Sequence, residues 1–215
     1  MLDRGTLQSR VAAVDLDGPG IDRAIDSPIL RMVRCMGTVF RLIADEVLEP
    51  ADAGYYTECQ ACGKPQVPVY LCQGYMACPD GSADKARDVY AACEKCLKQG
   101  CIVNIDEYRM DPLIERYAED PEAEKRSLRM TPRIPLHMQG GDWPLCCGTL
   151  TEFVGSPSSL EELVHVQEAG TPWDLGPDNL MQYDARRDGP PESFREVSVF
   201  QCFVCDRQHW TFQPT

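Results

Sequence analysis

Paired cysteines are the feature that most constrains how this chain can fold. Of the twelve cysteines among 215 residues, eight form closely spaced pairs. Two-residue spacing lets a tight turn aim both thiolates, together with several backbone amides, at one metal ion. Two such turns complete the tetrahedral shell of four sulfurs that zinc prefers, so the sequence predicts metal sites made of four cysteines each. The pairs are Cys59 with Cys62, Cys93 with Cys96, Cys146 with Cys147, and Cys202 with Cys205.

The order of the pairs along the chain assigns them to sites. The first two pairs form one site, and the pair nearest the C-terminus takes Cys146 and Cys147, the nearest unused cysteines. We therefore expect one or two Zn²⁺ ions held by the eight paired cysteines. Two alternatives stay open. In the first alternative, the cysteines are unrelated thiols of the core. In the second, one pair is a thioredoxin-like redox centre, although no pair has both the βαβ context and the helix start that such a centre needs.

Charge and hydropathy exclude several classes of protein. The chain has 34 acidic and 21 basic residues, a net charge of −13, so we expect no binding to duplex nucleic acid, which requires a basic surface. No apolar run approaches the ~20 residues of a membrane span, and no secretory signal follows Met1. We expect no membrane insertion and a cytoplasmic location, where cysteine pairs are more often metal ligands than disulfides.

An amphipathic helix is predicted over residues 28–48. Ser27 can cap this helix, Pro28 suits its first position, and Pro50 ends it. Its apolar residues recur every three or four positions, so one face either covers the core or forms a seam for self-association. The stripe consists of Ile29, Val33, Met36, Phe40, Ile43 and Val47.

The rest of the chain predicts an α+β fold of small zinc-knuckle or ribbon-like β-hairpins with helices packed between them. A terminal hairpin is expected over residues 197–212, with its turn at the last cysteine pair. We divide the chain into an N-terminal extension, residues 1–50, which contains the amphipathic helix, and a cysteine-rich zinc-binding domain, residues 51–215. Helix starts are predicted at Asp111-Pro112, at Asp120-Pro121 and at Ser158 with capping-box spacing, the last helix ending at Gly170.

Five segments match the pattern of a known family: Cys59–Pro65, Cys93–Leu97, Met130–Pro132, Trp143–Gly155 and Phe200–Trp210. The most specific are Trp143–Gly155, where the family reads Trp-x-x-His-Cys-Gly-Asp-x-Cys-x-Phe-Leu-Gly, and the terminal Phe-x-Cys-x-x-Cys knuckle. Over residues 55–215 the chain thus resembles the CbrC-like bacterial proteins, which are described as colicin-tolerance proteins. The resemblance implies an immunity or tolerance factor against a toxin such as a nuclease bacteriocin.

Two departures from the family pattern concern the second site. Cys146 stands where the family has histidine, and Thr151 stands where it has a second cysteine. If the family's site uses both loop cysteines, Thr151 removes a ligand. Cys146 can supply the missing thiolate, which strains the turn, and His209 is a substitute imidazole. The remaining cysteines are predicted to be buried thiols or, for the last three, caps of the first site: Cys35, Cys72, Cys78 and Cys101.

Protein binding is the function we expect. Ten Asp or Glu and three Arg lie between Glu152 and Glu196. An acidic face speeds association with a basic partner such as a toxin domain, although solubility alone also accounts for it. The segment Thr171–Arg195, with Trp173, is the candidate contact loop.

Two other functions stay open. One is a metalloenzyme or thiol-redox protein that uses an open second site, in which Cys147 and the terminal pair leave one zinc position for substrate. The other is a zinc-knuckle binder of single-stranded RNA, which the acidic charge disfavours. No nucleotide-binding or hydrolase motif occurs, so no catalytic residue is predicted.

Overall fold

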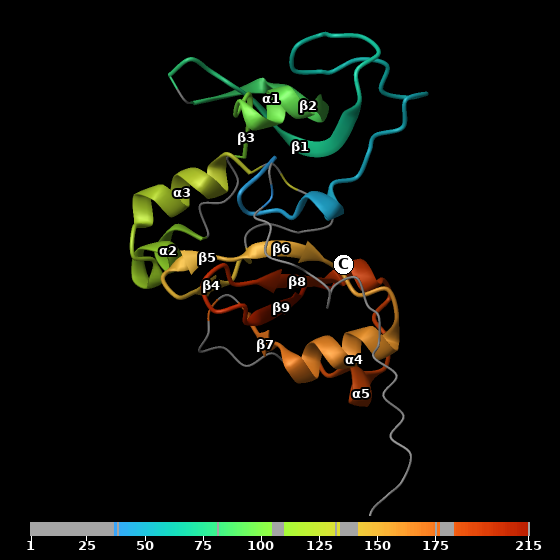
Figure 1. The fold of residues 1–215 in the computed structure, drawn as a ribbon, viewed down its shortest axis with the longest axis vertical. Coiled ribbons are helices and arrows are strands. Elements are labelled where there is room, and N and C mark those ends of the chain that lie inside the picture. Colours follow the sequence, from blue (N-terminus) through green and yellow to red (C-terminus); the bar gives the residue numbers. More distant parts are fainter. Residues whose placement is uncertain are drawn as a thin grey trace, which may run out of the picture.

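The described part of this computed structural model contains three sheets with helices beside them, and the two larger sheets lie one above the other in Figure 1. The residues described are 37, 39–80, 82–104, 110–131, 133, 142–174, 176 and 183–214. The sheets are small and largely antiparallel, which confirms the predicted α+β class. No helix in the described part of the chain has the length and apolar character needed to cross a bilayer.

The first sheet has the strand order β2-β1-β3. Its two long strands form an antiparallel hairpin whose register shifts twice, and α1 begins directly where β2 ends. The second cysteine pair, Cys93 and Cys96, therefore lies where the strand passes directly into the helix. The elements are β1 (Val69–Ala77), β2 (Ala83–Cys93), α1 (Glu94–Lys98) and β3 (Ile102–Val103).

The second sheet has the order β6-β8-β9-β7, and helix α4 packs against it (Figure 1). Strands β8 and β9 form the predicted terminal hairpin, in which Gln201 pairs with Gln208 on either side of the cysteine turn. The predicted loop contains a two-residue strand, β7, which runs parallel to β9. The elements are β6 (Glu152–Gly155), α4 (Leu160–Ala169), β7 (Thr171–Pro172), α5 (Ala185–Asp188), η4 (Phe194–Glu196), β8 (Val197–Gln201) and β9 (Gln208–Phe212).

Two further helices and a short hairpin complete the described fold. Asp120 caps α3 by accepting from the Ala123 amide, as its position before Pro121 predicts. The cap of α4 is Ser159 rather than Ser158, because the Ser159 hydroxyl accepts from the Glu162 amide. The elements are α2 (Asp111–Tyr117), α3 (Pro121–Arg129), β4 (Leu145–Cys146) and β5 (Thr149–Leu150).

The prediction of an N-terminal helix is wrong for its second half, residues 39–48. Residues 28–36 and 38 lie outside the described residues, but residues 39–48 contain only one 3-10 turn, η2 (Asp45–Val47). The backbone of residues 42–49 instead hydrogen-bonds to both larger sheets. The Phe153 amide donates to Leu42 and the Phe153 carbonyl accepts from Ala44, while the Leu71 amide donates to Glu49.

A common apolar core explains this pairing. Leu42 and Ile43 are fully buried in the same cluster as Val89 of the first sheet and Phe153 and Phe200 of the second. An exposed helix would bury one stripe of its side chains, whereas this segment buries consecutive residues between the two sheets. Burial together with strand-like hydrogen bonds therefore overrides the helical spacing of Phe40, Ile43 and Val47.

Candidate metal centres

The first cysteine group joins the segment before β1 to the end of β2 and the helix α1 that follows it. The sulfurs of Cys59, Cys62, Cys93 and Cys96 all lie within 4.8 Å of one another. The Cys62 and Cys93 Sγ atoms are 4.0 Å apart. A Zn–S bond of about 2.3 Å places the sulfurs of a tetrahedral shell about 3.8 Å apart, so the spacing fits a zinc ion. None of the described cysteines is in a disulfide.

A tight turn aims the first two thiols of this group. The Gly63 amide donates to the Cys59 carbonyl at 2.7 Å, and the Cys59 amide donates to Lys64 at 3.0 Å. Gly63 has φ +65°, a left-handed conformation that glycine adopts without a steric cost. The glycine after the second cysteine therefore closes the knuckle.

Helix α1 supplies the other two thiols. Cys93 is the residue before the helix and Cys96 lies within it, so one turn of helix brings both to the same side. The Cys93 amide donates to the Cys59 sulfur at 3.2 Å. Gln60, in the knuckle, fastens the turn to β2 because its side-chain oxygen accepts from the amides of Tyr90 and Ala91.

The electrostatics of the first group favour at least one thiolate. Burial raises the pKa of Cys59, but backbone amides of Cys93, Cys62 and Ala61 donate to its sulfur and together lower this pKa to about 7. Burial, followed by neighbouring thiols, raises the pKa of Cys96. A divalent cation would keep all four sulfurs deprotonated and remove this conflict.

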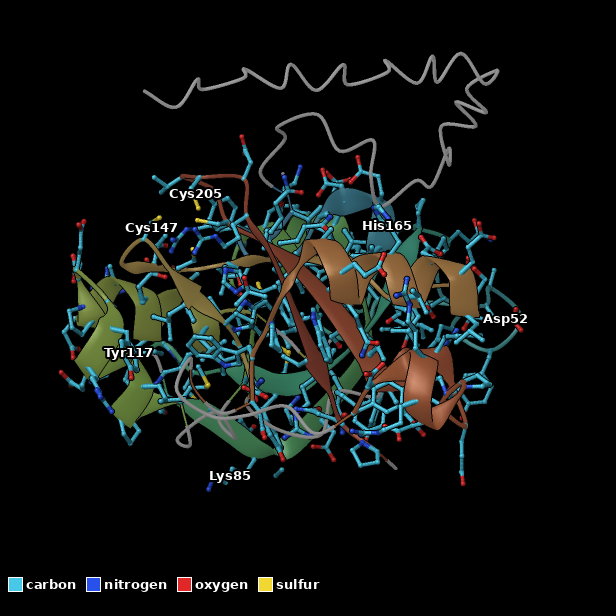
Figure 2. The ribbon with its side chains drawn as sticks, turned by 90° about the horizontal axis from the view of Figure 1, so that it is seen from below. Asp52, Lys85, Tyr117, Cys147, His165 and Cys205 are labelled. Atoms are coloured by element: carbon cyan, nitrogen blue, oxygen red, sulfur yellow. The ribbon has the colours of Figure 1, made fainter. Side chains whose placement is uncertain are left out.

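The second group lies where the tips of two hairpins meet. Cys146 and Cys147 come from the β4–β5 hairpin, and Cys202 and Cys205 come from the β8–β9 turn, with all four sulfurs within 4.8 Å of one another. Figure 2 shows Cys147 and Cys205 beside each other at the surface. The Cys146 sulfur lies 3.7 Å from that of Cys205 and 3.9 Å from that of Cys147, again close to tetrahedral spacing.

The terminal knuckle repeats the hydrogen bonds of the first one. The Asp206 amide donates to Cys202 at 3.2 Å, and the Cys202 amide donates to Arg207 at 2.9 Å. Asp206, with φ +57°, takes the place of Gly63. Asp tolerates this left-handed conformation better than most residues, which allows a knuckle without a following glycine.

A strained turn allows two adjacent cysteines to serve one group. Cys147 has φ +51° and Gly148 has φ +77°, the two positive angles of a type I′ hairpin turn. Cysteine does not favour this conformation, and a left-handed non-glycine residue costs about 1–2 kcal/mol. The predicted strain is therefore present at Cys147, and the turn directs both sulfurs to the same point.

The thiols of the second group differ in how readily they lose a proton. The backbone amide of Arg207 donates to the Cys205 sulfur and, with the neighbouring thiols, lowers its pKa to about 7. Burial raises the pKa of Cys146, and the nearby Cys202 and Cys205 raise it further. As in the first group, the arrangement suits a cation better than four protonated thiols.

Of the two residues considered as substitutes for the ligand missing at Thr151, Cys146 lies in the second group and His209 does not. Thr151 is fully buried, and its hydroxyl donates to the Pro144 carbonyl at 2.9 Å. His209 is buried in β9 and is not among the clustered groups. Burial, followed by the charge of Arg207, lowers the pKa of His209 to about 4. Four thiols are therefore available for a tetrahedral shell at this group without Thr151 or His209.

The other cysteines lie apart from both groups or outside the described residues. Cys72 is fully buried, and burial raises its pKa to about 12, as expected for a core thiol. Cys78 and Cys101 are half-buried and belong to neither cluster. Cys35 lies outside the described residues.

Several acidic side chains between Glu152 and Glu196 are buried or paired with a basic residue of the same segment. Glu152, Glu162 and Glu196 are buried, and Asp188 pairs with Arg187 at 2.7 Å. Trp173, expected to be a contact residue, is buried too, with 1 % of its surface exposed. The count of charges in the sequence thus overstates the acidic surface, and the assignment of Trp173 to a contact surface is wrong.

Sequence reasoning missed the residues that hold the knuckles in place. Gln60 and Asp206 give no signal by residue type alone, whereas Gly63, directly after a Cys-x-x-Cys pair, is a recognisable one. Comparison of the chain with known protein families, with curated proteins and with solved structures found no match.

Proposed function

We propose that this chain is a zinc-binding protein with two structural tetrathiolate sites, and that it acts by binding another protein. One observation carries the zinc assignment: eight cysteines lie in two groups of four, each with sulfurs within 4.8 Å of one another. Thiolate sulfur in a tetrahedral set of four is the donor set of structural zinc.

Few apolar contacts hold the first knuckle in place, which explains why it would need an ion. Between residues 52 and 68, Cys59 is the single buried residue. A segment that buries so little apolar surface does not recover the entropy lost on ordering. A zinc ion that joins this segment to α1 supplies the missing stabilisation.

The donor count favours a structural role over catalysis. Catalytic zinc keeps a position open for water or substrate, with three protein ligands. Each group here offers four thiols, and no histidine or carboxylate joins either cluster among the described residues. The four sulfurs would close the shell.

The protein-binding part of the proposal rests on the resemblance to the CbrC-like proteins. Two segments that carry this resemblance, Trp143–Gly155 and Phe200–Trp210, pack together around the second cysteine group. The Trp143 and Phe200 rings meet edge to face at 5.3 Å. Val204, in the terminal knuckle, is 67 % exposed beside the cysteines. This tip would contact a toxin or a component of its entry route.

Exposed ligands give the sharpest test of the zinc sites. Cys62 and Cys205 are exposed, so replacing either sulfur by oxygen costs little packing. We expect Cys62→Ser and Cys205→Ser each to lose one zinc per chain and to lower the free energy of unfolding. Cys78→Ser, at a cysteine outside both groups, should keep the zinc content of the wild type. Loss of zinc with an unchanged unfolding transition would contradict a structural role.

Toxin tolerance is tested in cells. We expect a sensitive bacterium that produces this protein to survive exposure to a colicin that kills the parent strain. Val204→Asp should abolish that survival while leaving the zinc content unchanged, because it changes the exposed tip and no sulfur. Equal killing of producing and parent cells across a panel of colicins would contradict the tolerance role.

A further inference from the structure

A cavity of about 420 Å³ lies beside the first cysteine group. Cys62, Cys93 and Cys96 are among the residues that line it, and Val67 and Tyr70 contribute to its mostly apolar walls. Ligand pockets commonly have a volume of about 300–1,000 Å³, apolar walls and a few polar groups. The cavity therefore has the size and the lining of a site for a small molecule.

Two lysines give the cavity a charge preference. Lys64 and Lys95 both line it and are exposed, and neither ammonium group has a hydrogen-bond or ion-pair partner among the described residues. Glu94, which also lines the cavity, is paired with Lys98 at 2.5 Å. In a chain with a net charge of −13, two unpaired ammonium groups at one cavity stand out. They favour a ligand with an anionic group.

We propose that this cavity binds a small organic anion with an aromatic or branched aliphatic body and one carboxylate. The body fills the apolar space between Val67 and Tyr70, and the carboxylate reaches Lys64 and Lys95. The site is distinct from the protein-binding tip of the second cysteine group.

The direction in which the ligand binds rests on the proposed function. A zinc ion with four thiolates carries a net charge of −2, so the sulfurs that line the cavity repel an anion. A ligand therefore needs an apolar body to lie against the sulfurs and a carboxylate to pair with the lysines. An amphipathic acid meets both requirements, whereas a compact inorganic anion meets only the second.

Calorimetric titration of the full chain with 4-phenylbutyrate tests the inference. We expect saturable binding, tighter than that of the uncharged 4-phenylbutanol by about 5-fold, the effect of a solvent-exposed ion pair. Lys64→Ala and Lys95→Ala should each remove most of this preference. Lys85→Ala, at an exposed lysine of β2 outside the cavity lining, should leave it unchanged. The zinc content of the same sample is measured separately, so a failure of the cavity is distinguished from a failure of the zinc sites.

Alkylation locates the bound acid. Cys101 lines the cavity, whereas Cys78 does not, and both are half-buried thiols outside the zinc groups. Saturating 4-phenylbutyrate should slow the reaction of Cys101 with iodoacetamide, measured by mass spectrometry, and leave Cys78 unaffected. Equal affinity for the acid and the alcohol, no binding at millimolar concentration, or equal protection of both cysteines would overturn the proposal.

Discussion

The Sγ atoms of Cys146 and Cys205 lie 3.7 Å apart although 59 positions separate the two residues in the sequence. Each sulfur sits at the tip of a hairpin, and the two hairpins meet at these tips and in the core below them. Four thiols in contact provide no cohesion of their own, whereas an ion between them joins the two hairpins. This relationship ties metal content to the stability of the fold.

The turn at Cys147 allows its backbone role to be separated from its sulfur. Cys147→Asn and Cys147→Val both remove the thiol, and both should lose the second zinc. Asn tolerates φ +51° and the β-branched Val does not, so we expect the Val variant to be less stable by about 1–2 kcal/mol. Urea unfolding of the two variants, at matched zinc content, measures this difference. Equal stabilities would show that the turn relaxes without cost.

Glu124 links helix α3 to the N-terminal segment and to β5. Its carboxylate accepts from Arg41 at 2.8 and 3.0 Å and from the Leu150 amide at 3.1 Å, and only 6 % of the residue is exposed. Glu124→Ala removes the acceptor of the buried Leu150 amide, whereas Arg41 keeps its hydrogen bonds to Ser127 and Thr149. We therefore expect a loss of about 1–3 kcal/mol in the free energy of unfolding.

The matched control for Glu124 is Glu122 on the same helix. Glu122 is exposed and contacts Lys125 at 3.2 Å, so Glu122→Ala should cost less than about 0.5 kcal/mol. Thermal or urea unfolding of both variants gives the comparison. Similar losses at the two positions would contradict the role assigned to Glu124.

Glu152 should make stability depend on pH. Burial, then the nearby charges of Glu46 and Asp45, raise its pKa to about 7, although the Gly37 amide donates to its carboxylate. The folded protein therefore binds this proton more tightly than the unfolded chain does. The stabilisation is complete below the unfolded pKa of about 4.5 and is lost as the pH rises through 7.

Glu152→Gln isolates this effect from the pH dependence of zinc binding. The amide oxygen of Gln can still accept from Gly37, but the side chain does not ionise. We expect the variant to gain about 1–3 kcal/mol of stability relative to the wild type between pH 6 and pH 8.5. Denaturant unfolding at three pH values checks this. A constant difference between the two proteins would show that Glu152 does not titrate in this range.

Local features of the fold were predictable because contiguous residues encode them. The cap at Asp120, the hairpin closed by the Cys202–Cys205 turn and the spacing of the cysteines within each pair all depend on a few neighbouring residues. Turn chemistry and capping are short-range, so the sequence alone specifies them.

Features that depend on distant pairing were not predictable. Phe40, Ile43 and Val47 are spaced as in a helix, yet hydrogen bonds with Phe153 draw their segment into the core. Strand β7 exists only because it pairs with β9, and Trp173 follows it into the interior. In both places, burial outweighs the local pattern.

The zinc-to-protein ratio of anaerobically purified protein tests the central claim most directly. Elemental analysis should find two zinc ions per chain, and the absorption spectrum should show no visible band, because zinc has a filled d shell. Iron with visible absorbance, or a chain that folds with no bound metal, would contradict the account of two structural zinc sites.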